Sequence, residues 1–429
     1  MSDAWNRGRL GDVCRVIPGY AFKSSDWQDE GIPVVKIKNI TSDNAVDLTA
    51  TDCVPESVLT PKLQKFVLKD GDILLAMTGA TAGKVGKVRT KQPILLNQRV
   101  AKISPVEADH GFIWSVVSSQ EYQEKFFNLA DGAAQPNMSG GQIEGIEIPL
   151  PPLPVQRRIA GILSAYDELM ENNQRRIRLF EIMSRALYRE WFIHFRFPGH
   201  DKLPCVASPL GNIPKGWEAI SFETLLTSMT GGDWGSDQPT ETESAEVSIV
   251  RGTDFDEVAY GGQLRAPVRY IKPSSLKSRG LRHGDVIVEN SINAKSRCIG
   301  TTLLVDSNVL ARIGRDAVAA SFCKVFRLHD PRLAPLVHLH FRRLREDARM
   351  EYYQNVAANG IGNFQAQKFA KEEHLVLPED EALRAKLIGT IAAMFENISV
   401  ISSQLSNLRR TRDLLLPRLL SGQISLATN

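Results

Sequence analysis

The chain has 429 residues, enough for two to four domains with cores of their own, and its 43% hydrophobic and 24% charged content is that of an ordinary soluble globular protein. The net charge of +3 identifies no partner, and the five scattered cysteines form no CxxC pair, which argues against a zinc site and a disulfide framework. We find no signal peptide and no apolar run of 18 residues, so we expect a cytoplasmic location.

An internal repeat organises the expected elements in chain order. The first half contains a β-rich run with central cations at 31–40, a Gly-Asp turn before an apolar strand at 68–77, and the loop ADGAAQPN at 130–137. A proline cluster around Pro149 then closes this part and begins a helix. The same order recurs at 246–255, 281–290, 358–365 and Pro378. We therefore predict two copies of one mixed α/β unit, each followed by a helix.

Both predicted helices have a heptad pattern. Apolar residues follow alternating steps of three and four from Ile159 to Leu187 and from Leu387 to Leu415, with Pro154 near the start of the first helix and Pro417 at the end of the second. The matching positions favour pairing of the two helices as an antiparallel coiled coil, although two unrelated core helices are the alternative. The first predicted seam comprises Ile159, Ile162, Tyr166, Leu169, Asn173, Arg176, Phe180, Met183 and Leu187.

Motifs for catalysis are weak. The stretch MTGATAGKVGKV at 77–88 is not favoured as a phosphate loop, because its glycine spacing is one residue short and Val85 replaces the Ser or Thr that would reach magnesium. His338 and His340 lack nearby ligand partners and are interpreted as a surface pair. The chain has no Gly-x-Ser-x-Gly elbow and no Asn/Asp-Pro-Pro-aromatic tetrapeptide. We therefore predict no catalytic residue and no metal ligand.

Basic segments and amide side chains predict DNA binding. Residues 62–102 hold nine Lys or Arg against two acids, and residues 265–297 hold eight against two, although a solvated basic face is the alternative for either segment alone. Arg and Lys recognise guanine or phosphate, and Asn and Gln recognise adenine. The candidate DNA-binding residues are Lys36, Lys38, Asn39, Lys84, Asn97, Gln98, Arg99, Gln135 and Asn137 in the first copy, and Arg251, Asn290, Asn293, Lys295, Arg297, Asn363, Gln365 and Gln367 in the second.

Several motifs together resemble the specificity (S) subunit of type I restriction-modification systems. They span nearly the whole chain: GYAFKSSDW (19–27), GDILLAMTGATAGKVG (71–86), IPLPPLPVQRRIAGILSAYDELMENNQRRI (148–177), GNIPKGWEAI (211–220) and LLLPRLLSGQISL (414–426). The proline junction and the closing motif are fairly specific, whereas the glycine loops are weak alone. The second junction, LVLPEDEALRAKLI, lacks the Pro-Pro and Gln of the first, which puts the rigidity of that junction in doubt.

The resemblance implies an α+β fold with two pseudo-repeated mixed α/β target recognition domains separated by two long helices. The expected segments are recognition domain 1 (1–153), a central spacer helix (154–197), recognition domain 2 (198–378), and a distal spacer helix with the C-terminal tail (379–429). Each recognition domain would read one half of a bipartite, asymmetric site in double-stranded DNA, and the helices would set the gap.

The resemblance also implies partners. Two methyltransferase (M) subunits would bind S-adenosylmethionine and methylate adenine, and restriction/translocase (R) subunits would use ATP and Mg, while this chain would bind no cofactor and catalyse nothing. The alternatives are a DNA-modifying enzyme and a coiled-coil scaffold without sequence readout.

Overall fold

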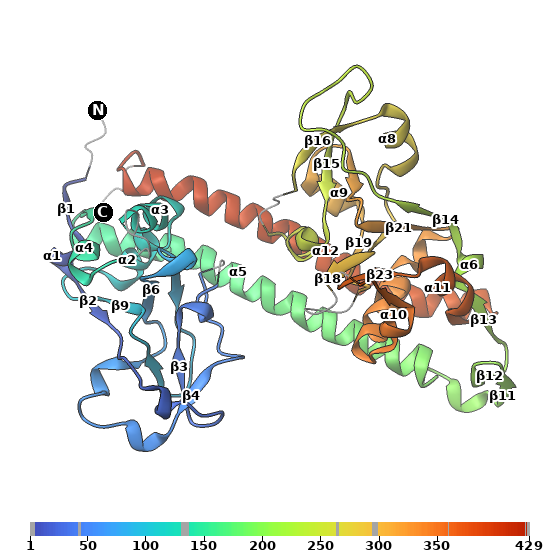
Figure 1. Cartoon of the computed structure of the whole chain (residues 1–429), viewed down its shortest axis with the longest axis horizontal. Helices are drawn as coiled ribbons and strands as arrows, with labels where there is room; N and C mark the ends of the chain where they lie inside the picture. The colour runs from blue at the N-terminus through green and yellow to red at the C-terminus, as the bar shows by residue number, and fades with distance from the viewer. Residues whose placement is uncertain are drawn as a thin grey trace. The chain divides into compact units, whose positions relative to one another are not determined.

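The computed structural model describes residues 5–41, 44–129, 137–262, 266–293, 299–358, 360–424 and 426. The chain divides into two compact units of mixed helix and sheet. Unit 1 comprises Met1–Glu168 and Arg409–Asn429, and unit 2 comprises Leu169–Leu408. Two long helices, α5 (Leu153–Tyr188) and α12 (Glu381–Leu420), each contribute one stretch to unit 1 and another to unit 2 (Figure 1).

Unit 1 contains two four-stranded sheets. The first is antiparallel, in the order β2 (Cys14–Pro18), β9 (Val100–Pro105), β6 (Ile73–Ala76), β7 (Val85–Lys87). The second has the order β4 (Asp52–Val54), β3 (Ile32–Val35), β8 (Ile94–Leu96), β5 (Val67–Leu68), and its β3–β8 pair is parallel. Unit 1 also contains β1 (Arg7–Arg9) paired with β10 (Glu147–Pro149), several short 3-10 turns, and the helices α1 (Leu10–Val13), α2 (His110–Val117), α3 (Gln120–Leu129) and α4 (Gly140–Glu144).

Unit 2 is built from more strands. Its four-stranded sheet has the order β14 (Leu226–Gly231), β21 (Cys323–Leu328), β17 (Val286–Glu289), β19 (Thr302–Leu304). Two three-stranded sheets have the orders β16 (Val268–Ile271), β15 (Ala245–Val250), β20 (Ala317–Ala319) and β18 (Ser291–Asn293), β23 (Ile361–Phe364), β22 (Gln354–Val356). The two-stranded pairs are β11 (Cys205–Ser208) with β12 (Gly211–Pro214) and β13 (Trp217–Ser221) with β24 (His374–Pro378).

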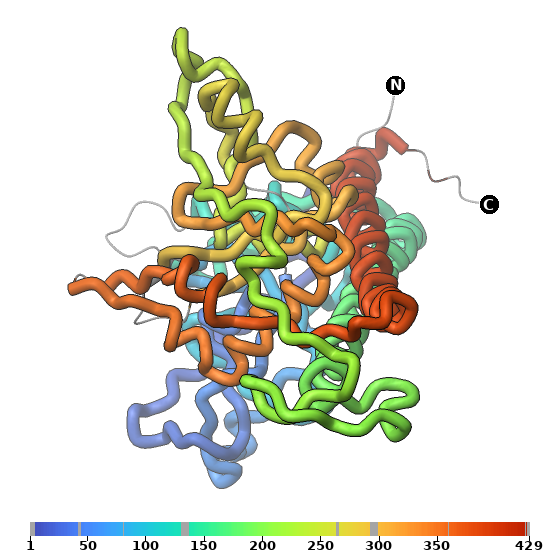
Figure 2. Tube along the Cα trace, turned by 90° about the vertical axis from the view of Figure 1, so that its right-hand side faces the viewer, coloured from blue at the N-terminus to red at the C-terminus, as the bar shows by residue number. Residues whose placement is uncertain are grey.

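The helices of unit 2 lie between these strands in the chain. They are α6 (Phe222–Leu225), α7 (Phe255–Ala259), α8 (Pro273–Arg279), α9 (Ser307–Ile313), α10 (Ala334–Glu346) and α11 (Ala366–Glu372). A π-helical turn, Arg189–Ile193, continues α5 at its C-terminal end. The connection from β14 to β15 is a long extended excursion, visible as the yellow-green tube in Figure 2.

The internal repeat appears in the structure as a repeated strand order. The sheet β2-β9-β6-β7 of unit 1 and the sheet β14-β21-β17-β19 of unit 2 are both antiparallel and have the same connectivity. The parallel pair β3·β8 has its counterpart in β15·β20, and the pair β1·β10 has its counterpart in β13·β24. These sheets and strand pairs therefore have the same order and direction in the two units.

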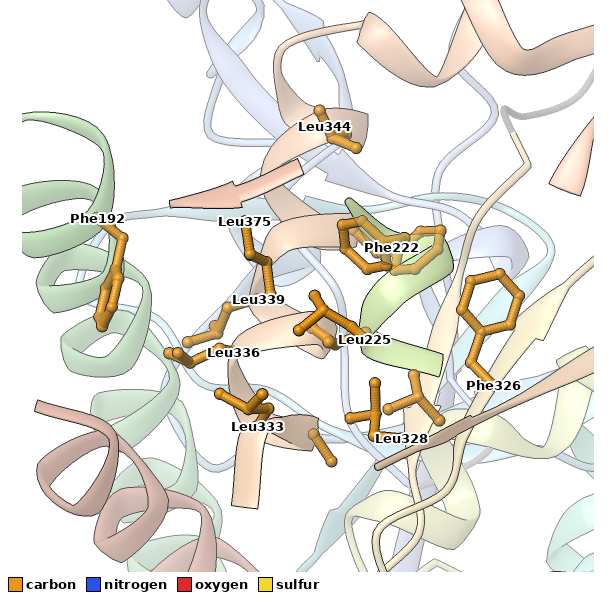
Figure 3. Close-up of a cluster of buried hydrophobic side chains, with 14 of the residues drawn as sticks. Phe192, Phe222, Leu225, Phe326, Leu328, Leu333, Leu336, Leu339, Leu344 and Leu375 are labelled. Atoms are coloured by element: carbon orange, nitrogen blue, oxygen red, sulfur yellow. The ribbon is translucent and has the colours of Figure 1, made fainter. Parts of the chain in front are cut away.

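Each unit has its own apolar core. In unit 2 the core gathers around α10: Figure 3 shows its Leu336 and Leu339 on the side toward Phe192, with Phe222 of α6 and Phe326 of β21 on the other side of the helix. Every residue from Leu336 to Phe341 is buried, so this part of α10 lies inside the core on all sides. In unit 1 the corresponding core joins β6 and β9 to α2 and to the start of α5.

The buried side of α5 differs from the predicted seam at alternate positions. Leu169 and Met183 are 52% and 49% exposed, whereas Met170, Ile177 and Ser184 are buried. Arg176, which the prediction placed in the seam, is exposed. The helix carries apolar residues on two adjacent stripes, and burying Ile177 avoids the cost of removing a guanidinium from water. This cost explains why the stripe containing Ile177 is buried, a choice that the spacing of apolar residues alone does not determine.

The second helix follows its predicted seam more closely. Leu387, Ile391, Ile398 and Leu405 are all buried in α12. Pro417 lies inside the helix, which continues to Leu420, so the prediction that this proline ends the helix was wrong. Because a proline has no amide N–H, Pro417 removes only one hydrogen bond of the helix. The residues after it complete the last turn, and the helix ends at Leu420.

Composition alone would allow α12 to cross a membrane. Within the described residues it is the one helix with an 18-residue window of mean hydropathy 1.2, and 39% of that window is buried inside the structure. In unit 2, its residues Ile398, Ile401 and Leu405 pack with Met170 and Ile177 of α5. Packing against another helix therefore accounts for part of its apolar character.

The histidine pair is buried, so the surface interpretation was wrong. His338 and His340 lie on α10 with 8% and 2% exposure. Nδ1 of His338 lies 2.9 Å from the Thr302 hydroxyl, and Nδ1 of His340 lies 2.7 Å from the Tyr188 hydroxyl. Nε2 of His340 lies 3.0 Å from Glu373. Partners from three other parts of the chain satisfy these rings, and no local pattern could show them.

Candidate nucleic-acid interface

Four chain segments meet at one end of the unit 1 sheets. The amide of Asn97, in the turn between β8 and β9, donates to the carbonyl of Val35 at 3.1 Å. The amide of Met77 donates to the carbonyl of Arg99 at 3.0 Å. The amide of Met138 in turn donates to the carbonyl of Met77, also at 3.0 Å. These bonds bring together the end of β3, the turn at 97–99, the glycine loop after β6, and the segment that enters α4.

Unit 2 repeats this junction bond for bond. The amide of Ala320 donates to the carbonyl of Val250 at 2.8 Å. The amide of Asn290 donates to the carbonyl of Phe322, and the amide of Phe364 donates to the carbonyl of Asn290, both at 2.8 Å. Arg99 therefore corresponds to Phe322. Two further pairings follow from the same register: Asn97 corresponds to Ala320, and Asn137, which forms a bridge with Thr78, corresponds to Asn363, which pairs with Ser291.

This register corrects the alignment of the last repeat. Pairing 130–137 with 358–365 end to end placed Asn137 opposite Gln365. The backbone bonds instead pair Asn137 with Asn363, two residues earlier. The sequence alignment missed this shift because a loop may differ in length without changing the strands on either side of it.

A glycine holds each turn close to its neighbouring strand. A Cβ added to Gly19 would overlap the carbonyl oxygen of Asn97, and one added to Gly232 would overlap that of Ala320. The amides of these glycines donate to Val100 and Cys323 at 3.0 and 3.1 Å. Only glycine allows the backbones to approach this closely.

The lysines at the end of β3 share one carboxylate. The ammonium groups of Lys36 and Lys38 lie 3.0 and 2.9 Å from the same oxygen of Asp52. Hydrogen bonds from Lys38 and Lys36 lower the pKa of Asp52, so this carboxylate stays ionised. Lys36 also lies over the ring of Trp27, 3.4 Å from its centroid. Any phosphate bound here would share both ammonium groups with Asp52.

Asn39 is a loop-forming residue. Its side chain is buried, its Oδ1 accepts from the amide of Lys36 at 2.9 Å, and its Nδ2 donates to the carbonyl of Asp47 at 3.0 Å. In unit 2, Asp254 takes the equivalent place and accepts from the amide of Arg251 at 2.9 Å. With its polar atoms bonded inside the protein, Asn39 has no face left for a base.

Arg251 is also bonded to its own loop. Its Nε and Nη2 donate to the two oxygens of Asp254 at 2.9 and 2.7 Å, and these bonds raise the pKa of the guanidinium. This paired geometry is the one that Arg would otherwise offer to guanine. The equivalent cations Lys36 and Arg251 are therefore both held by an acid next to the turn.

Other predicted residues in unit 1 are open to solvent. Gln98, Arg99 and Asn137 are exposed, and Lys84 and Asn97 are half-buried. Within the described ranges, no ion pair engages the side chain of Lys84 or Arg99. The turn at 97–99 therefore presents an amide and a guanidinium outward from a rigid backbone.

The predicted residues of unit 2 form a short polar chain. Nδ2 of Asn290 donates to the hydroxyl of Ser291 at 3.3 Å, and that hydroxyl donates to Oδ1 of Asn363 at 2.7 Å. Oδ1 of Asn290 is buried and has no hydrogen-bond partner among the described residues. Gln365 is half-buried next to the start of α11, and Gln367 is exposed on that helix.

Four predicted residues cannot be placed. Gln135, Lys295 and Arg297 lie outside the described residues, and so does the side chain of Asn293, whose backbone belongs to β18.

The aromatic side chains at the unit 2 junction were not predicted from the sequence. Phe322 is 57% exposed, and its ring centroid lies 6.3 Å from that of Trp234, over which the Arg269 guanidinium lies at 5.1 Å. An aromatic residue gives no sequence signal of exposure.

No metal centre accompanies these loops in the described part of the chain. There, no group of three or more His, Cys, Asp or Glu side chains gathers in a way that could hold a metal ion. The two junctions carry side-chain amides, a hydroxyl and a guanidinium, which are kinds of group that contact phosphates and base edges in protein–DNA complexes.

Known proteins of one kind resemble this chain. Residues 2–179 match the family model described as the type I restriction modification DNA specificity domain. The type I restriction enzyme MjaIX specificity subunit of Methanocaldococcus jannaschii is 20% identical over 98% of this chain and 93% of its own length. The EcoBI specificity subunit of Escherichia coli is 25% identical over 60% of this chain and 54% of its own length.

A solved structure has the same fold along nearly its whole length. It is the S subunit of a type I restriction-modification system from M. genitalium, with a TM-score of 0.57, 15% sequence identity, and coverage of 98% of this chain and 97% of that one. The domain match, the full-length relative and the shared fold agree. Residues 2–179 thus match the DNA specificity domain of type I restriction-modification systems, and the chain is similar along nearly its whole length to a specificity subunit of such a system.

Proposed function

We propose that this chain reads a bipartite, asymmetric site in double-stranded DNA, with one junction of polar loops for each half-site. The observation that carries the proposal is the repeated junction, in which the same backbone bonds hold the turns at 97–99 and 320–322. Two copies of one scaffold with different side chains suit a site whose halves differ in sequence. The chain itself would catalyse nothing.

The long helices supply the second part of the proposal, a spacer between the half-sites. In unit 2, Met170 and Ile177 of α5 pack with Ile398 and Ile401 of α12, and in unit 1 Arg412 of α12 forms an ion pair with Asp167 of α5 at 3.0 Å. Low residue numbers in α5 thus meet high ones in α12, which supports an antiparallel coiled coil.

The same helices would dock the partner subunits. On α5, Leu169, Leu179, Ile182 and Met183 are about half exposed, although burying each of them would be worth roughly 1.5–3 kcal/mol. This apolar surface supports the docking of two adenine methyltransferase subunits, which would bind S-adenosylmethionine. Restriction/translocase subunits, using ATP and Mg, would join that complex in the cytoplasm.

An exchange of segments tests the modular part of the proposal. Residues 1–150 are replaced by those of another specificity subunit with a known site, and the methylated motif is mapped in cells that also contain the methyltransferase partner. We expect only one half of the motif to change, because only one junction is replaced. The reciprocal exchange of residues 198–378 should change only the other half. A change of both halves by either exchange would contradict independent reading.

A further inference from the structure

The two turns share a backbone but differ in chemistry. The carbonyls of Arg99 and Phe322 accept equivalent hydrogen bonds from Met77 and Asn290, so the two residues occupy the same place in the two units. At that place unit 1 presents a guanidinium and unit 2 a benzyl ring. A difference at a matched position is what two recognition surfaces for different sequences require.

Neither side chain is buried by the fold. No ion pair among the described residues engages Arg99, which is exposed. Phe322 is 57% exposed, and leaving an apolar ring in water forgoes the free energy that its burial would supply. Its position is costly for an isolated subunit and useful for one that covers the ring on binding.

The turns are rigid enough to position these side chains. Each is bonded to the end of β3 or β15 and to the segment after β6 or β17, and each lies tightly against a glycine, Gly19 or Gly232. The equivalent residues Asn137 and Asn363 belong to the segments that are hydrogen-bonded to Met77 and Asn290, the partners of the two turns. Because the backbone of each turn is already fixed, it loses little conformational entropy when the side chain contacts a base.

We infer that Arg99 and Phe322 are the matched specificity-determining residues of the two units, an inference that rests on the proposed function. Arg99 donates paired N–H groups to O6 and N7 of a guanine in the half-site of unit 1. Phe322 makes an apolar contact with the methyl group of a thymine in the half-site of unit 2. The neighbouring cations Lys36 and Arg251, held by their acids, play no part in this discrimination.

The test is a selection from duplexes with randomised sequence, using the full-length chain in complex with its methyltransferase partner. We expect the wild-type complex to select a two-part motif. Arg99→Ala should reduce the preference for one guanine in one half by about 5- to 100-fold, and Phe322→Ala should reduce the preference for one thymine in the other half. Arg99→Gln should move the preference at that position towards adenine, a gain that misfolding could not produce.

Matched controls separate readout from general damage. Arg157→Ala removes an exposed arginine from α5, and Tyr352→Ala removes an exposed aromatic residue elsewhere in unit 2; both should leave the motif intact. A wild-type two-part motif that neither Arg99 nor Phe322 variants alter would overturn this inference and leave the proposed function standing. Equal weakening for every sequence would also overturn it, since that result marks a phosphate contact. A wild-type complex without a two-part motif would overturn the proposed function itself.

Discussion

The hydroxyl of Ser291 donates a hydrogen bond to the side-chain oxygen of Asn363 at 2.7 Å, across an antiparallel strand pair at the unit 2 junction. The bond orients the Asn363 amide so that its NH2 group is turned away from the serine. In unit 1 the same place is taken by Thr78 and Asn137. An amide fixed in this way is better prepared to recognise an adenine than one that must be ordered on binding.

Removing the donor should therefore relax sequence reading in one half of the site. With Ser291→Ala, the Asn363 amide loses its orienting bond, and we expect weaker discrimination at one position of the unit 2 half-site, together with a loss of about 1 kcal/mol of unfolding free energy. A randomised-duplex selection and a urea titration measure the two effects. Ser278→Ala on α8, which removes only local helix bonds, is the control. Undiminished discrimination would mean that Ser291 has only a structural role.

Two adjacent glycines provide a matched test of the close approach at the junction. In Gly232→Ala the new methyl group would collide with the Ala320 carbonyl, whereas in Gly231→Ala it would meet no atom within 4 Å. We expect the first change to lower the free energy of unfolding by about 1–3 kcal/mol and the second to lower it by less. Denaturant unfolding compares them. Equal effects would show that the turn has room to move.

Acid should destabilise unit 2 through its buried histidines. Burial lowers the pKa of His338 to about 3 and lowers that of His340 as well. Because the unfolded chain binds these protons near pH 6.5, stability is present above that pH and is lost as the pH falls toward 3. Below about pH 6, the His338 ring contributes a slope of up to about 1.4 kcal/mol per pH unit.

The contribution of one ring can be isolated by substitution. His338→Gln should remove about 1 kcal/mol per pH unit from the slope of unfolding free energy between pH 6.5 and 5, measured by urea titration. His329→Gln changes an exposed histidine and serves as the control. A slope that His338→Gln leaves unchanged would mean that His338 does not bind its proton mainly in the unfolded state.

The spacer role of the helices predicts a change in gap length. Four residues inserted after Gln174 of α5 and four at the facing level of α12 would lengthen both helices by about 6 Å, or roughly two base pairs of DNA. We expect the gap between half-sites to change while both half-site sequences stay the same, as read from methylated motifs. Four residues inserted in the exposed turn between β11 and β12 should change neither. An unaltered gap would mean that the helices do not set the distance.

The fold was largely predictable from the sequence, because duplication leaves its record in turn signals and apolar runs. The Gly-Asp turns before β6 and β17 have the same local structure: the amides of Lys69 and Arg282 both donate to the aspartate at 2.8 Å. The helix α5 was also predictable, but its buried stripe was not, since apolar residues on two neighbouring stripes leave the choice to tertiary packing.

The candidate site was predictable by region and less so by residue. Exposed amides and cations such as Gln98 and Arg99 were found because base recognition needs those groups. Asn39 has the same chemistry but is consumed by its own loop, which only the hydrogen bonds of the structure reveal. Phe322 was missed, because an exposed aromatic side chain and a core one look alike in a sequence.

One measurement tests the central claim most directly. The chain is expressed with its methyltransferase partner in a host that lacks adenine methylation, and modified adenines are mapped by long-read sequencing. The account predicts a two-part motif with an unspecified gap, which disappears when this chain is omitted. Methylation at a single compact motif, or methylation that persists without this chain, would contradict it.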